Sequence, residues 1–383
     1  MEYPRKLDLS ELASKKSFFL LGPRAAGKSY LARKTFGNRA VNIDLLSSDL
    51  AFRLTAAPGD LEAIIAARGP GPHTVVIDEI QRLPLLLDEV HRLIEKEGHR
   101  FVLTGSSARK LRRGGVNLLA GRAWTAELHP LTAGEIPGFD LERFLRFGGL
   151  PPVHRSDFPE EELHAYCSTY LREEIQSEGL VRKLPQFSRF LTVSALGSGA
   201  MLNFAALSRD TGVPASSIRE YYSVLADTLL GFYLEPWTRS RKRRAISTAK
   251  FYLFDVGVAH TLAGTKNIDR NSDLYGRSFE HFIGMELRAF LSYERIREPL
   301  RYWRSAQGHE VDFVVGDRLA VEVKATRRVA DHDLRSLRAL HEEGIIEALL
   351  LVTQDRVATI RDGIRCIPWQ DFLEELWSKK LPL

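Results

Sequence analysis

The sequence predicts an α/β protein made of several domains. A buried strand, a glycine loop and a helix follow one another in residues 17–36, a pattern that opens a sheet flanked by helices. Helical patterns dominate residues 141–230, and two alternating strands follow within residues 310–324. Because a chain of 383 residues is too long for one ordinary core, two or three domains are expected.

The composition is that of a soluble globular protein, with 44% hydrophobic and 27% charged residues. No stretch approaches ~18 uninterrupted apolar residues, and the first residues lack the apolar segment of a signal peptide, so no membrane association is expected. Only Cys167 and Cys366 occur, without ligand-like spacing. This disfavours a disulfide scaffold or a zinc site and favours a cytoplasmic location.

The loop after the first strand matches a phosphate-binding pattern in full. It reads Gly22-x-x-x-x-Gly27-Lys28-Ser29 between a strand and a helix. Glycines let backbone N–H groups curl around an anion, and the start of the helix adds partial positive charge. Lys28 is expected to reach the β- and γ-phosphates of ATP, and Ser29 to ligate Mg²⁺. The expected nucleotide-binding residues are Gly22, Pro23, Arg24, Ala25, Ala26, Gly27, Lys28, Ser29 and Tyr30.

A second buried strand, residues 75–77 in "HTVVIDEIQRLP", ends in two neighbouring acids. Asp78 would hold Mg²⁺ through water, and Glu79 would polarise the attacking water. Two exposed acids that cap a strand would give the same pattern, but the intact phosphate loop upstream favours the catalytic interpretation. The paired acids indicate hydrolysis rather than switching alone.

A third buried strand, residues 101–104, ends in small polar residues. In additional-strand ATPases such a strand lies between the other two, and its polar tip senses the γ-phosphate. Thr104 and Ser106 are the candidates, although ordinary strand-end caps explain them equally well. Arg122 could act in trans as an arginine finger. Three other arginines compete for that role: Arg109, Arg112 and Arg113.

Five strands complete the first domain, which we place at residues 1–138. "VNIDLL" at residues 41–46 and "AWTAEL" at residues 123–128 join the three strands above, with helical segments between them. This alternation predicts a doubly wound α/β core of the P-loop ATPase type.

The middle of the chain is predicted to contain a helical lid, residues 139–192, and a winged helix, residues 193–265. The lid pattern is interrupted at "GGLP", residues 148–151. Two helices then flank residues 212–214, with an apolar face formed by Ile218, Tyr222, Leu225 and Leu229. The outward residues that could read a DNA groove are Ser216, Ser217, Arg219 and Ser223.

The predicted winged helix carries a basic run, residues 238–250, between two strands. The whole chain has a net charge of only +5, yet this run contains six basic residues and no acid. Such a local patch suits a phosphate backbone. The expected DNA-binding residues are Arg219, Arg239, Arg241, Lys242, Arg243 and Arg244. A solvated loop and a protein-docking module are the alternatives.

The runs "EVDFVV" and "LAVEVK" predict a hairpin. If its loop is residues 316–318, Asp312 lies opposite Glu322, and Lys324 shares their face. The opposite face would be an apolar layer of Val311, Phe313, Val315, Leu319, Val321 and Val323. A two-residue loop would instead put the two acids on opposite faces.

Opposed carboxylates repel each other unless a cation lies between them, so Mg²⁺ is expected beside Asp312 and Glu322. Lys324 could orient water or steady charge that develops on a phosphate. Glu280, on a predicted helix upstream, is a candidate third acid. The order of elements in residues 266–383 is typical of PD-(D/E)xK nucleases, with Glu280, Asp312, Glu322 and Lys324 forming the site.

These segments resemble prokaryotic AAA-type ATPases with a C-terminal domain related to the PD-(D/E)xK nucleases. The resemblance covers nearly the whole chain and rests on "GPRAAGKS", "VVIDEIQRLP", "FVLTGSS", "LAGRAWTAELHPL", "RFGGLPPV", "KFYLFDVGVAHTL" and "HEVDFVVGDRLAVEVKA". It implies a P-loop (ASCE/AAA-type) ATPase core that uses ATP and Mg²⁺, a lid, a winged helix and a nuclease-like α/β end. It also implies a homo-oligomer, with a hexameric ring as one form, but it fixes no substrate.

The combined expectation is a DNA-stimulated ATPase that binds and remodels duplex or branched DNA, such as recombination structures. The expected catalytic residues are Lys28, Asp78, Glu79, Thr104 and Arg122. Two alternatives remain open: an ATP-gated, Mg²⁺-dependent DNA nuclease, and a signalling switch ATPase that binds a protein partner through the winged helix.

Overall fold

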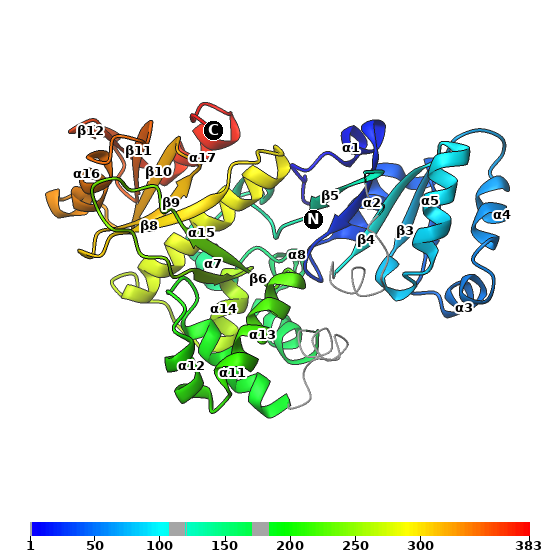
Figure 1. The fold of residues 1–383 in the computed structure, drawn as a ribbon, viewed down its shortest axis with the longest axis horizontal. Coiled ribbons are helices and arrows are strands. Elements are labelled where there is room, and N and C mark those ends of the chain that lie inside the picture. The colour runs from blue at the N-terminus through cyan, green and yellow to red at the C-terminus, as the bar shows by residue number, and fades with distance from the viewer. Residues whose placement is uncertain (1, 107–118, 120, 171–183) are drawn as a thin grey trace.

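A computed structural model describes residues 2–106, 119, 121–170 and 184–383. Figure 1 shows two β-sheets at opposite ends of the molecule, with a largely helical part beside them. A five-stranded sheet belongs to the N-terminal part of the chain, and an eight-stranded sheet belongs to the C-terminal part. In these ranges no helix combines the length and apolarity needed to cross a membrane.

The five-stranded sheet is entirely parallel and has the order β2-β3-β4-β1-β5. Its strands are β1 (Ser17–Leu21), β2 (Val41–Asp44), β3 (Thr74–Asp78), β4 (Arg100–Gly105) and β5 (Ala123–Glu127). The expected third strand, β4, therefore lies between the strands that carry the phosphate loop and the acid pair, as predicted. Parallel strands bring their carboxyl ends to one edge, which is where ligands bind in such sheets.

Helices cover both faces of this sheet. They are α1 (Leu9–Lys15), α2 (Lys28–Phe36), α3 (Ser48–Ala56), α4 (Asp60–Ala66) and α5 (Leu86–Glu97), with short turns η1 (Gly37–Arg39), η2 (Ile80–Arg82) and η3 (Ala133–Glu135). Phe18 and Leu20 pack on the side of α1 and α2, whereas Phe19 and Leu21 pack on the side of α4 and α5. This alternation of buried residues gives the doubly wound core that the sequence predicts.

The middle of the chain is helical. Its elements are α7 (Leu141–Phe147), α8 (Pro151–Arg155), α9 (Pro159–Ala165), the π-helix η4 (Tyr166–Tyr170), α11 (Leu184–Leu196), α12 (Phe204–Thr211), α13 (Ala215–Asp227) and α14 (Val256–Ala263). Ile218, Tyr222 and Leu225 of the predicted apolar face are buried on α13, and Leu229, also buried, follows the end of the helix. Of the residues predicted to face outward, Ser216, Arg219 and Ser223 are exposed and Ser217 is half-buried. One core cluster joins the lid helices to α11 and α13, because Val153, Phe190 and Leu225 all belong to it.

The eight-stranded sheet has the order β12-β13-β11-β10-β9-β8-β6-β7. Its strands are β6 (Gly231–Pro236), β7 (Lys250–Leu253), β8 (Leu300–Arg304), β9 (Glu310–Val315), β10 (Leu319–Lys324), β11 (Ala348–Thr353), β12 (Thr359–Arg361) and β13 (Ile364–Pro368). The β6–β7 hairpin, expected as part of a separate winged helix, pairs with β8 through Glu235 and Arg301. The predicted third and fourth domains therefore share one sheet.

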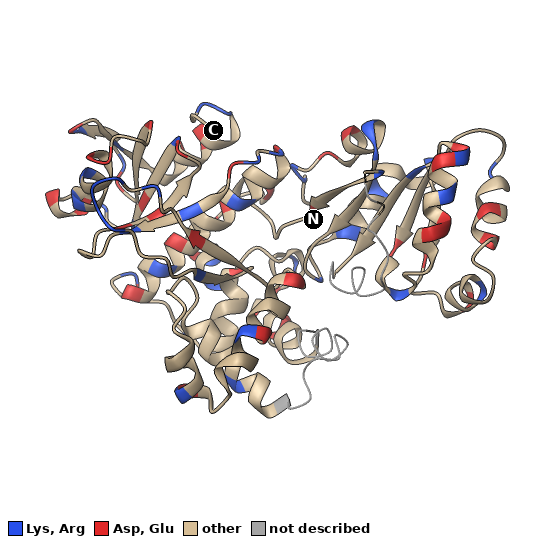
Figure 2. Ribbon diagram, viewed as in Figure 1, with Lys and Arg blue, Asp and Glu red and all other residues tan. Residues whose placement is uncertain are grey.

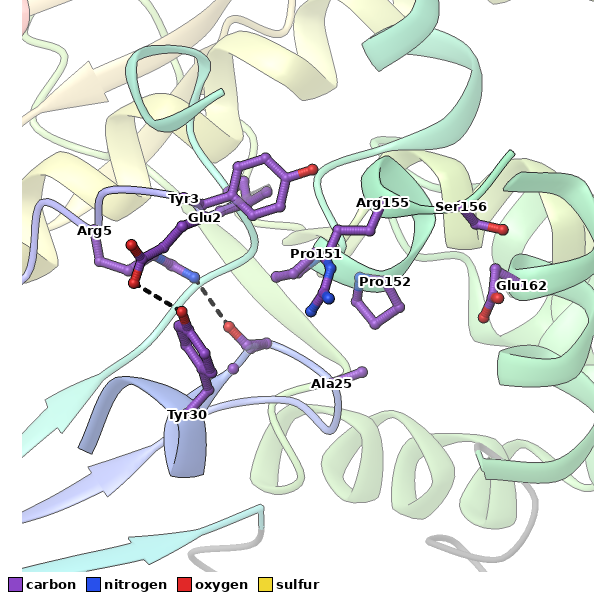
Figure 3. A pocket seen from close by; sticks show the side chains of 13 residues that line it. Glu2, Tyr3, Arg5, Ala25, Tyr30, Pro151, Pro152, Arg155, Ser156 and Glu162 are labelled. Atoms are coloured by element: carbon purple, nitrogen blue, oxygen red, sulfur yellow. Dashed lines mark hydrogen bonds between the residues drawn. The ribbon is translucent and has the colours of Figure 1, made fainter. Parts of the chain in front are cut away.

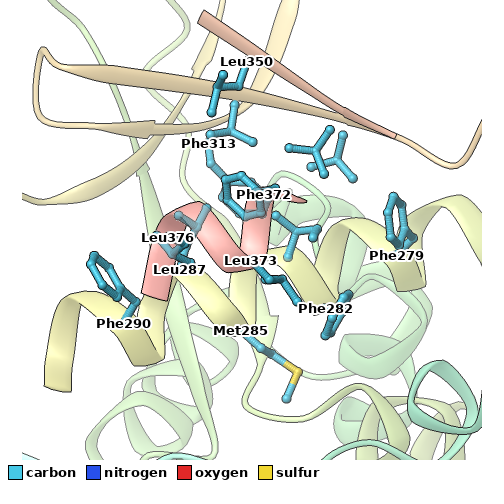
Figure 4. Packing of buried hydrophobic residues seen from close by; sticks show 14 of the residues in the cluster. Phe279, Phe282, Met285, Leu287, Phe290, Phe313, Leu350, Phe372, Leu373 and Leu376 are labelled. Atoms are coloured by element: carbon cyan, nitrogen blue, oxygen red, sulfur yellow. The ribbon is translucent and has the colours of Figure 1, made fainter. Parts of the chain in front are cut away.

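Helices also cover this second sheet on both faces. They are α15 (Asp273–Tyr293), α16 (Arg335–His341) and α17 (Trp369–Trp377), with the short turn η5 (Asp331–Leu334). Figure 4 shows α15 and α17 packed on one face, where Phe282 and Phe372 join the cluster around Phe313. α15 is about 31 Å long at ~1.5 Å per residue, and its last residue, Tyr293, packs against the five-stranded sheet. This helix therefore connects the two cores.

The β9–β10 hairpin has the predicted register. Val315 pairs with Leu319 and Phe313 with Val321, which leaves residues 316–318 as the loop. The pairing of β8 with β9 shifts by one residue, so that two residues of β9, Asp312 and Phe313, oppose Tyr302.

This bulge breaks the expected alternation. Val311 does not join the apolar layer around Phe313, and that part of the prediction was wrong. It packs with Trp303 in the cluster on the opposite face, because the extra residue reverses the side on which the preceding side chains lie.

Candidate functional site

The phosphate loop lies at the carboxyl edge of the five-stranded sheet, between β1 and α2. A Cβ atom on Gly22 would lie 2.4 Å from the carbonyl oxygen of Leu128, so only glycine fits this approach to the chain after β5. No side chain caps the N-terminus of α2 at Gly27. The first N–H groups of a helix point along its axis and carry partial positive charge, so this end of α2 favours an anion.

Lys28 points back over this loop. Its side chain is buried, with 5% of the residue exposed, and its Nζ donates hydrogen bonds of 2.8 Å to the Gly22 carbonyl and 3.0 Å to the Pro23 carbonyl. The ammonium group is thus held above the loop backbone and next to the first N–H groups of α2. Such an arrangement concentrates positive charge where a polyphosphate would lie.

Asp78, at the end of β3, is the centre of a polar cluster with Ser29 and Thr104. The Ser29 hydroxyl donates a hydrogen bond of 2.8 Å to Asp78 Oδ1, and the Thr104 hydroxyl donates to the same oxygen. A hydroxyl and a carboxylate are the oxygen ligands that Mg²⁺ prefers in nucleotide sites. The donor set therefore fits the expected metal ion, with Ser29 and Asp78 as the residues that would hold it.

Glu79 occupies an unusual backbone conformation. Its φ of 59° lies in the left-handed region, which costs energy for a residue with a side chain and is often found at functional sites. The backbone N–H of Glu79 donates to Thr104 Oγ1 at 3.1 Å. The acid pair and the tip of β4 are therefore one hydrogen-bonded unit.

Gln81 is a site residue that the sequence analysis missed. Its Nε2 donates to Glu79 Oε2 at 2.5 Å and to Ser106 Oγ at 3.2 Å. Its Oε1 is buried and has no hydrogen-bond partner among the residues that the structure describes. A buried acceptor beside the acid pair could receive a hydrogen bond from a water molecule or a ligand. The only sequence signal was its position two residues after Glu79.

A cavity of about 480 Å³ adjoins the loop. Figure 3 shows its wall, which includes Glu2, Tyr3, Arg5, Ala25, Tyr30, Pro151, Pro152, Arg155, Ser156 and Glu162. The cavity thus lies between the N-terminal segment, the phosphate loop and the lid helices α8 and α9. Ala26 and Gly27 also line it, whereas Arg24 is exposed on the loop. Its size and position suit the nucleoside part of a nucleotide.

Arg5 connects several parts of the cavity wall by hydrogen bonds and is a second residue that the sequence did not predict. Its guanidinium group donates to the carbonyl oxygens of Ala26 (2.9 Å) and His129 (2.6 Å), and to the hydroxyl of Tyr293 (3.0 Å) on α15. It also forms a buried ion pair with Glu135 at 3.1 Å. No sequence pattern predicts this role, because the partners of Arg5 are far apart in the chain.

Arg122 does not join this site within one chain. It precedes β5 and so lies at the amino edge of the parallel sheet, whereas the phosphate loop lies at the carboxyl edge. Its Nε forms an ion pair of 2.5 Å with Glu95 of α5. A role in trans therefore remains a prediction. The competing arginines, Arg109, Arg112 and Arg113, lie outside the described residues.

A second polar site, which we call the acidic centre, lies where β9 and β10 approach α15 and β7. We define it by Lys250, Glu280, Glu310, Asp312, Glu322 and Lys324. Lys324 Nζ lies 2.5 Å from Glu322 Oε1, and the backbone N–H of Val323 donates to Asp312 Oδ2 at 2.8 Å. The structure thus brings together all four residues that the sequence predicted here.

Lys250 and Glu310 are the members of the acidic centre that were not predicted. Lys250 Nζ lies 2.6 Å from Glu310 Oε1 and 3.4 Å from Glu280 Oε1. Glu310 Oε2 also pairs with Arg304 at 2.6 Å, and the Tyr252 hydroxyl donates to Glu280. Lys250 belongs to the basic run, whose charge pattern predicts a solvent-facing side chain, but the structure buries it among acids.

Burial controls the protonation of the acidic centre. It raises the pKa of Glu322 to about 7, although Lys324 opposes the shift. Burial and the neighbouring Glu322 also raise the pKa of Asp312. For Lys250, burial alone would lower the pKa, but the carboxylates of Glu280, Asp312 and Glu310 outweigh it and raise the pKa. The two lysines thus stay charged while the acids compete for protons.

The acidic centre offers the oxygen donors that Mg²⁺ prefers. Glu322 Oε2 is buried and lacks a hydrogen-bond partner in the described part of the chain. Within the same ranges, however, no three His, Cys, Asp or Glu side chains are placed together to hold a metal ion. The donor chemistry therefore fits Mg²⁺, whereas the side-chain positions are those of an ion-pair cluster in which lysines neutralise the acids.

The basic run, which the sequence predicts as part of a winged helix, does not project into solvent as a separate loop. Figure 2 shows its Lys and Arg residues on a loop that passes along α16. Arg239 pairs with Asp317, and Arg243 pairs with Glu342 and, at 3.4 Å, with Glu343. Two of the expected DNA-binding charges are therefore neutralised within the chain.

Three other basic side chains of the run face outward. Arg241, Lys242 and Arg244 are exposed and make no ion pair with a described residue, although the backbone N–H groups of Arg241 and Lys242 donate to Glu343. Arg219 is also exposed, and its guanidinium carbon lies 4.8 Å from the ring centre of Phe204. These four cations remain free to meet a polyanion.

Comparisons with known proteins divide the chain into three parts. A family model described as an AAA domain matches residues 14–137. Two models described as domains of unknown function, DUF8612 and DUF4143, match residues 138–269 and 275–372. The uncharacterized protein MJ1544 of Methanocaldococcus jannaschii is 23% identical over 331 residues, which cover 77% of this chain and 71% of that protein. The AAA match supports nucleoside triphosphatase activity and implies ATP binding, typically with Mg²⁺.

Proposed function

We propose that this protein hydrolyses ATP and uses the reaction to bind and remodel DNA. The observation that supports ATP hydrolysis is the cluster of residues at the carboxyl edge of the five-stranded sheet. Lys28 and the first N–H groups of α2 face the same edge as Asp78 and Glu79. A phosphate-binding loop that adjoins an acid pair is the arrangement that phosphoryl transfer to water requires.

Each residue has a defined task in this proposal. Lys28 binds phosphate oxygens, and Ser29 and Asp78 hold the Mg²⁺ ion, which neutralises phosphate charge when it is bound. Glu79 orients the attacking water and accepts its proton, and Gln81 fixes the Glu79 carboxylate. Thr104 couples the backbone of Glu79 to Asp78. Arg122 would complete the site of a neighbouring copy, which makes a homo-oligomer part of the proposal.

The DNA half rests on Arg219, Arg241, Lys242 and Arg244, the exposed cations on α13 and the β6–β7 loop. Because phosphate contacts dominate such binding, it should weaken steeply as salt rises. The test compares ATP turnover without DNA and with single-stranded, duplex and four-way DNA at low salt. We expect at least one DNA to bind and to raise turnover. If none does either, the DNA half is wrong, and a switch that binds a protein partner is favoured instead.

A second candidate function is Mg²⁺-dependent cleavage of a phosphodiester at the acidic centre. The unpartnered Glu322 Oε2 favours it. When all groups are ionised, the four carboxylates face three cations, Lys250, Lys324 and Arg304, which leaves one negative charge. Binding of one divalent cation and one phosphodiester anion together would bring the net charge of the site to zero. Either ion bound alone would leave the site charged. In this case Asp312→Asn abolishes cleavage of the DNA while ATP turnover survives.

A further inference from the structure

Lys250 connects the acidic centre to another part of the chain. It is the first residue of β7, whereas the carboxylates that it contacts lie on α15 and β9. Its side chain is only 4% exposed, and its Nζ also lies 5.1 Å from the ring centre of Tyr302. A buried lysine is costly unless it is paired, so the position of β7 is tied to the carboxylates that surround this ammonium group.

The same short segment ends at a second buried contact. Asp255 lies five residues after Lys250 and is fully buried. Its Oδ2 accepts a hydrogen bond of 2.7 Å from the backbone N–H of Gly149, and its Oδ1 accepts one of 3.0 Å from Val258, which caps α14. Asp255 therefore anchors the end of this segment to the turn between α7 and α8.

The turn between α7 and α8 is closely packed against Asp255 and α14. Gly148 has a φ of 73°, and a Cβ atom there would lie 1.9 Å from Asp255 Oδ1. A Cβ atom on Gly257 would lie 2.2 Å from the carbonyl group of Phe147. No side chain can be inserted between the turn and α14, so a movement of one must be followed by the other.

The turn leads directly into the wall of the nucleotide cavity. Pro151 and Pro152 line that cavity, and the Gly149 carbonyl accepts a hydrogen bond of 2.7 Å from Leu131, another lining residue. β7 ends at Leu253, and Phe254 forms a bend before Asp255. The short segment of residues 250–255 thus contacts the acidic centre at one end and the turn that supports the nucleotide cavity at the other.

We infer that Lys250 is a positioning residue of the acidic centre and that residues 250–255 couple this centre to the nucleotide cavity. The inference rests on the proposed function only for the identity of the ligand in the cavity. Nucleotide binding holds the turn between α7 and α8 in one position. Asp255, which is hydrogen-bonded to this turn, then determines the position of β7. Lys250 of β7 in turn determines where the Glu280 and Glu310 carboxylates lie. By reciprocity, a change at Lys250 must alter nucleotide affinity.

The test measures the Kd of a fluorescent ADP analogue in the presence of Mg²⁺. We expect Lys250→Met to weaken binding about fivefold or more, a common size for coupled sites, and Lys250→Arg to restore most of the affinity. Arg365→Met is the control, because Arg365 lies on β13 of the same sheet and pairs with a carboxylate, Glu375 of α17, but belongs to neither site. Equal affinity of the Lys250→Met and control variants would overturn the inference.

A double variant keeps the test valid if Lys250→Met fails to fold. Lys250→Met with Glu310→Gln removes both charges of the 2.6 Å pair, and Glu280 keeps the hydrogen bond that it accepts from the Tyr252 hydroxyl. The same loss of ADP affinity is expected, and wild-type affinity in this variant overturns the coupling. Because the test involves neither hydrolysis nor DNA, failure of the hydrolysis or the DNA part of the proposed function does not change this result.

Hydrogen exchange supplies the reverse measurement. ADP binding should slow exchange of the β10 amides, residues 319–324, in the wild-type protein and not in Asp255→Asn, which weakens the contact with Gly149. Protection of β10 that is the same in both proteins would show that the signal does not pass through Asp255, and the inference would be wrong.

Discussion

Gln81 Nε2 donates a hydrogen bond of 2.5 Å to Glu79 Oε2 and so fixes the carboxylate that we expect to orient the attacking water. Replacement of Gln81 by Leu should keep nucleotide affinity but lower kcat about tenfold, because a misplaced base is only partly effective. Steady-state ATP hydrolysis separates kcat from KM. A variant that loses affinity and kcat together would show that Gln81 contacts the nucleotide instead.

Glu79→Gln should have a larger effect than the change at Gln81. It removes the base but keeps the side-chain shape, so we expect kcat to fall about 10²- to 10⁴-fold while ATP still binds. Binding is measured by equilibrium titration and turnover by phosphate release. Glu97→Gln is the control, because Glu97 is an exposed acid at the end of α5. Turnover near the wild-type rate in Glu79→Gln would remove Glu79 from the mechanism.

Lys28→Met should impair both binding and turnover. Lys28 is the buried cation over the loop, so its loss should weaken ATP binding and lower kcat/KM by about 100-fold or more. Lys15→Met, at an exposed lysine of α1 that pairs with Glu11, should change neither. Nucleotide titration and hydrolysis assays of both variants check this. Normal affinity in Lys28→Met would place the phosphates elsewhere.

Glu286 should make folding stability depend on pH. It accepts hydrogen bonds from the backbone N–H of Ala133 (2.6 Å) and from Trp377 Nε1 (2.9 Å), and burial raises its pKa to about 7 from 4.5. Folding therefore favours the protonated form, so this contribution is full below about pH 4.5 and is lost as the pH rises through about 7. The slope in that window can reach about 1.4 kcal/mol per pH unit.

The measurement compares urea unfolding of the wild-type protein and Glu286→Gln from about pH 5 to about pH 8. Stability of the wild-type protein should fall relative to that of the variant as the pH rises, because glutamine does not titrate. Glu374→Gln, at an exposed acid of α17, should leave the curve parallel to that of the wild-type protein. Parallel curves for Glu286→Gln would show that Glu286 stays ionised in the folded state.

Local patterns predicted the nucleotide site because each of its parts is continuous in sequence. The phosphate loop, the acid pair and the tip of β4 are strand ends, and parallel pairing alone brings Lys28, Asp78 and Thr104 to one edge. The β9–β10 register was equally local, because loop length determines it. The bulge at Asp312 was not predictable, since it arises from pairing with β8 and leaves no mark in the alternation itself.

Residues that act across long separations were missed for the same reason. Arg5 meets Tyr293 across 288 positions, and nothing in the surroundings of either residue predicts the contact. For the basic run the sequence predicted too much exposure, because its charge pattern is typical of a solvent-facing surface. Arg243 and Lys250 instead form ion pairs with acids of the last domain. Charge runs identify which residues need partners, but only tertiary structure decides which partners they meet.

The basic run therefore predicts two separable classes of variant. Arg243 donates to the Ala339 carbonyl at 2.8 Å and pairs with Glu342, so Arg243→Met should lower folding stability by about 1 kcal/mol and leave DNA affinity nearly unchanged.

Arg241→Glu with Arg244→Glu should leave stability nearly unchanged, because both side chains are exposed, and should weaken DNA binding. Each lost phosphate contact should also reduce the slope of log K against log salt by about one. Thermal unfolding and a salt titration of DNA binding measure the two effects. If Arg243→Met weakens DNA binding as much as the double variant does, the Arg243 ion pairs must open when DNA binds, and the surface that meets DNA includes the face of α16.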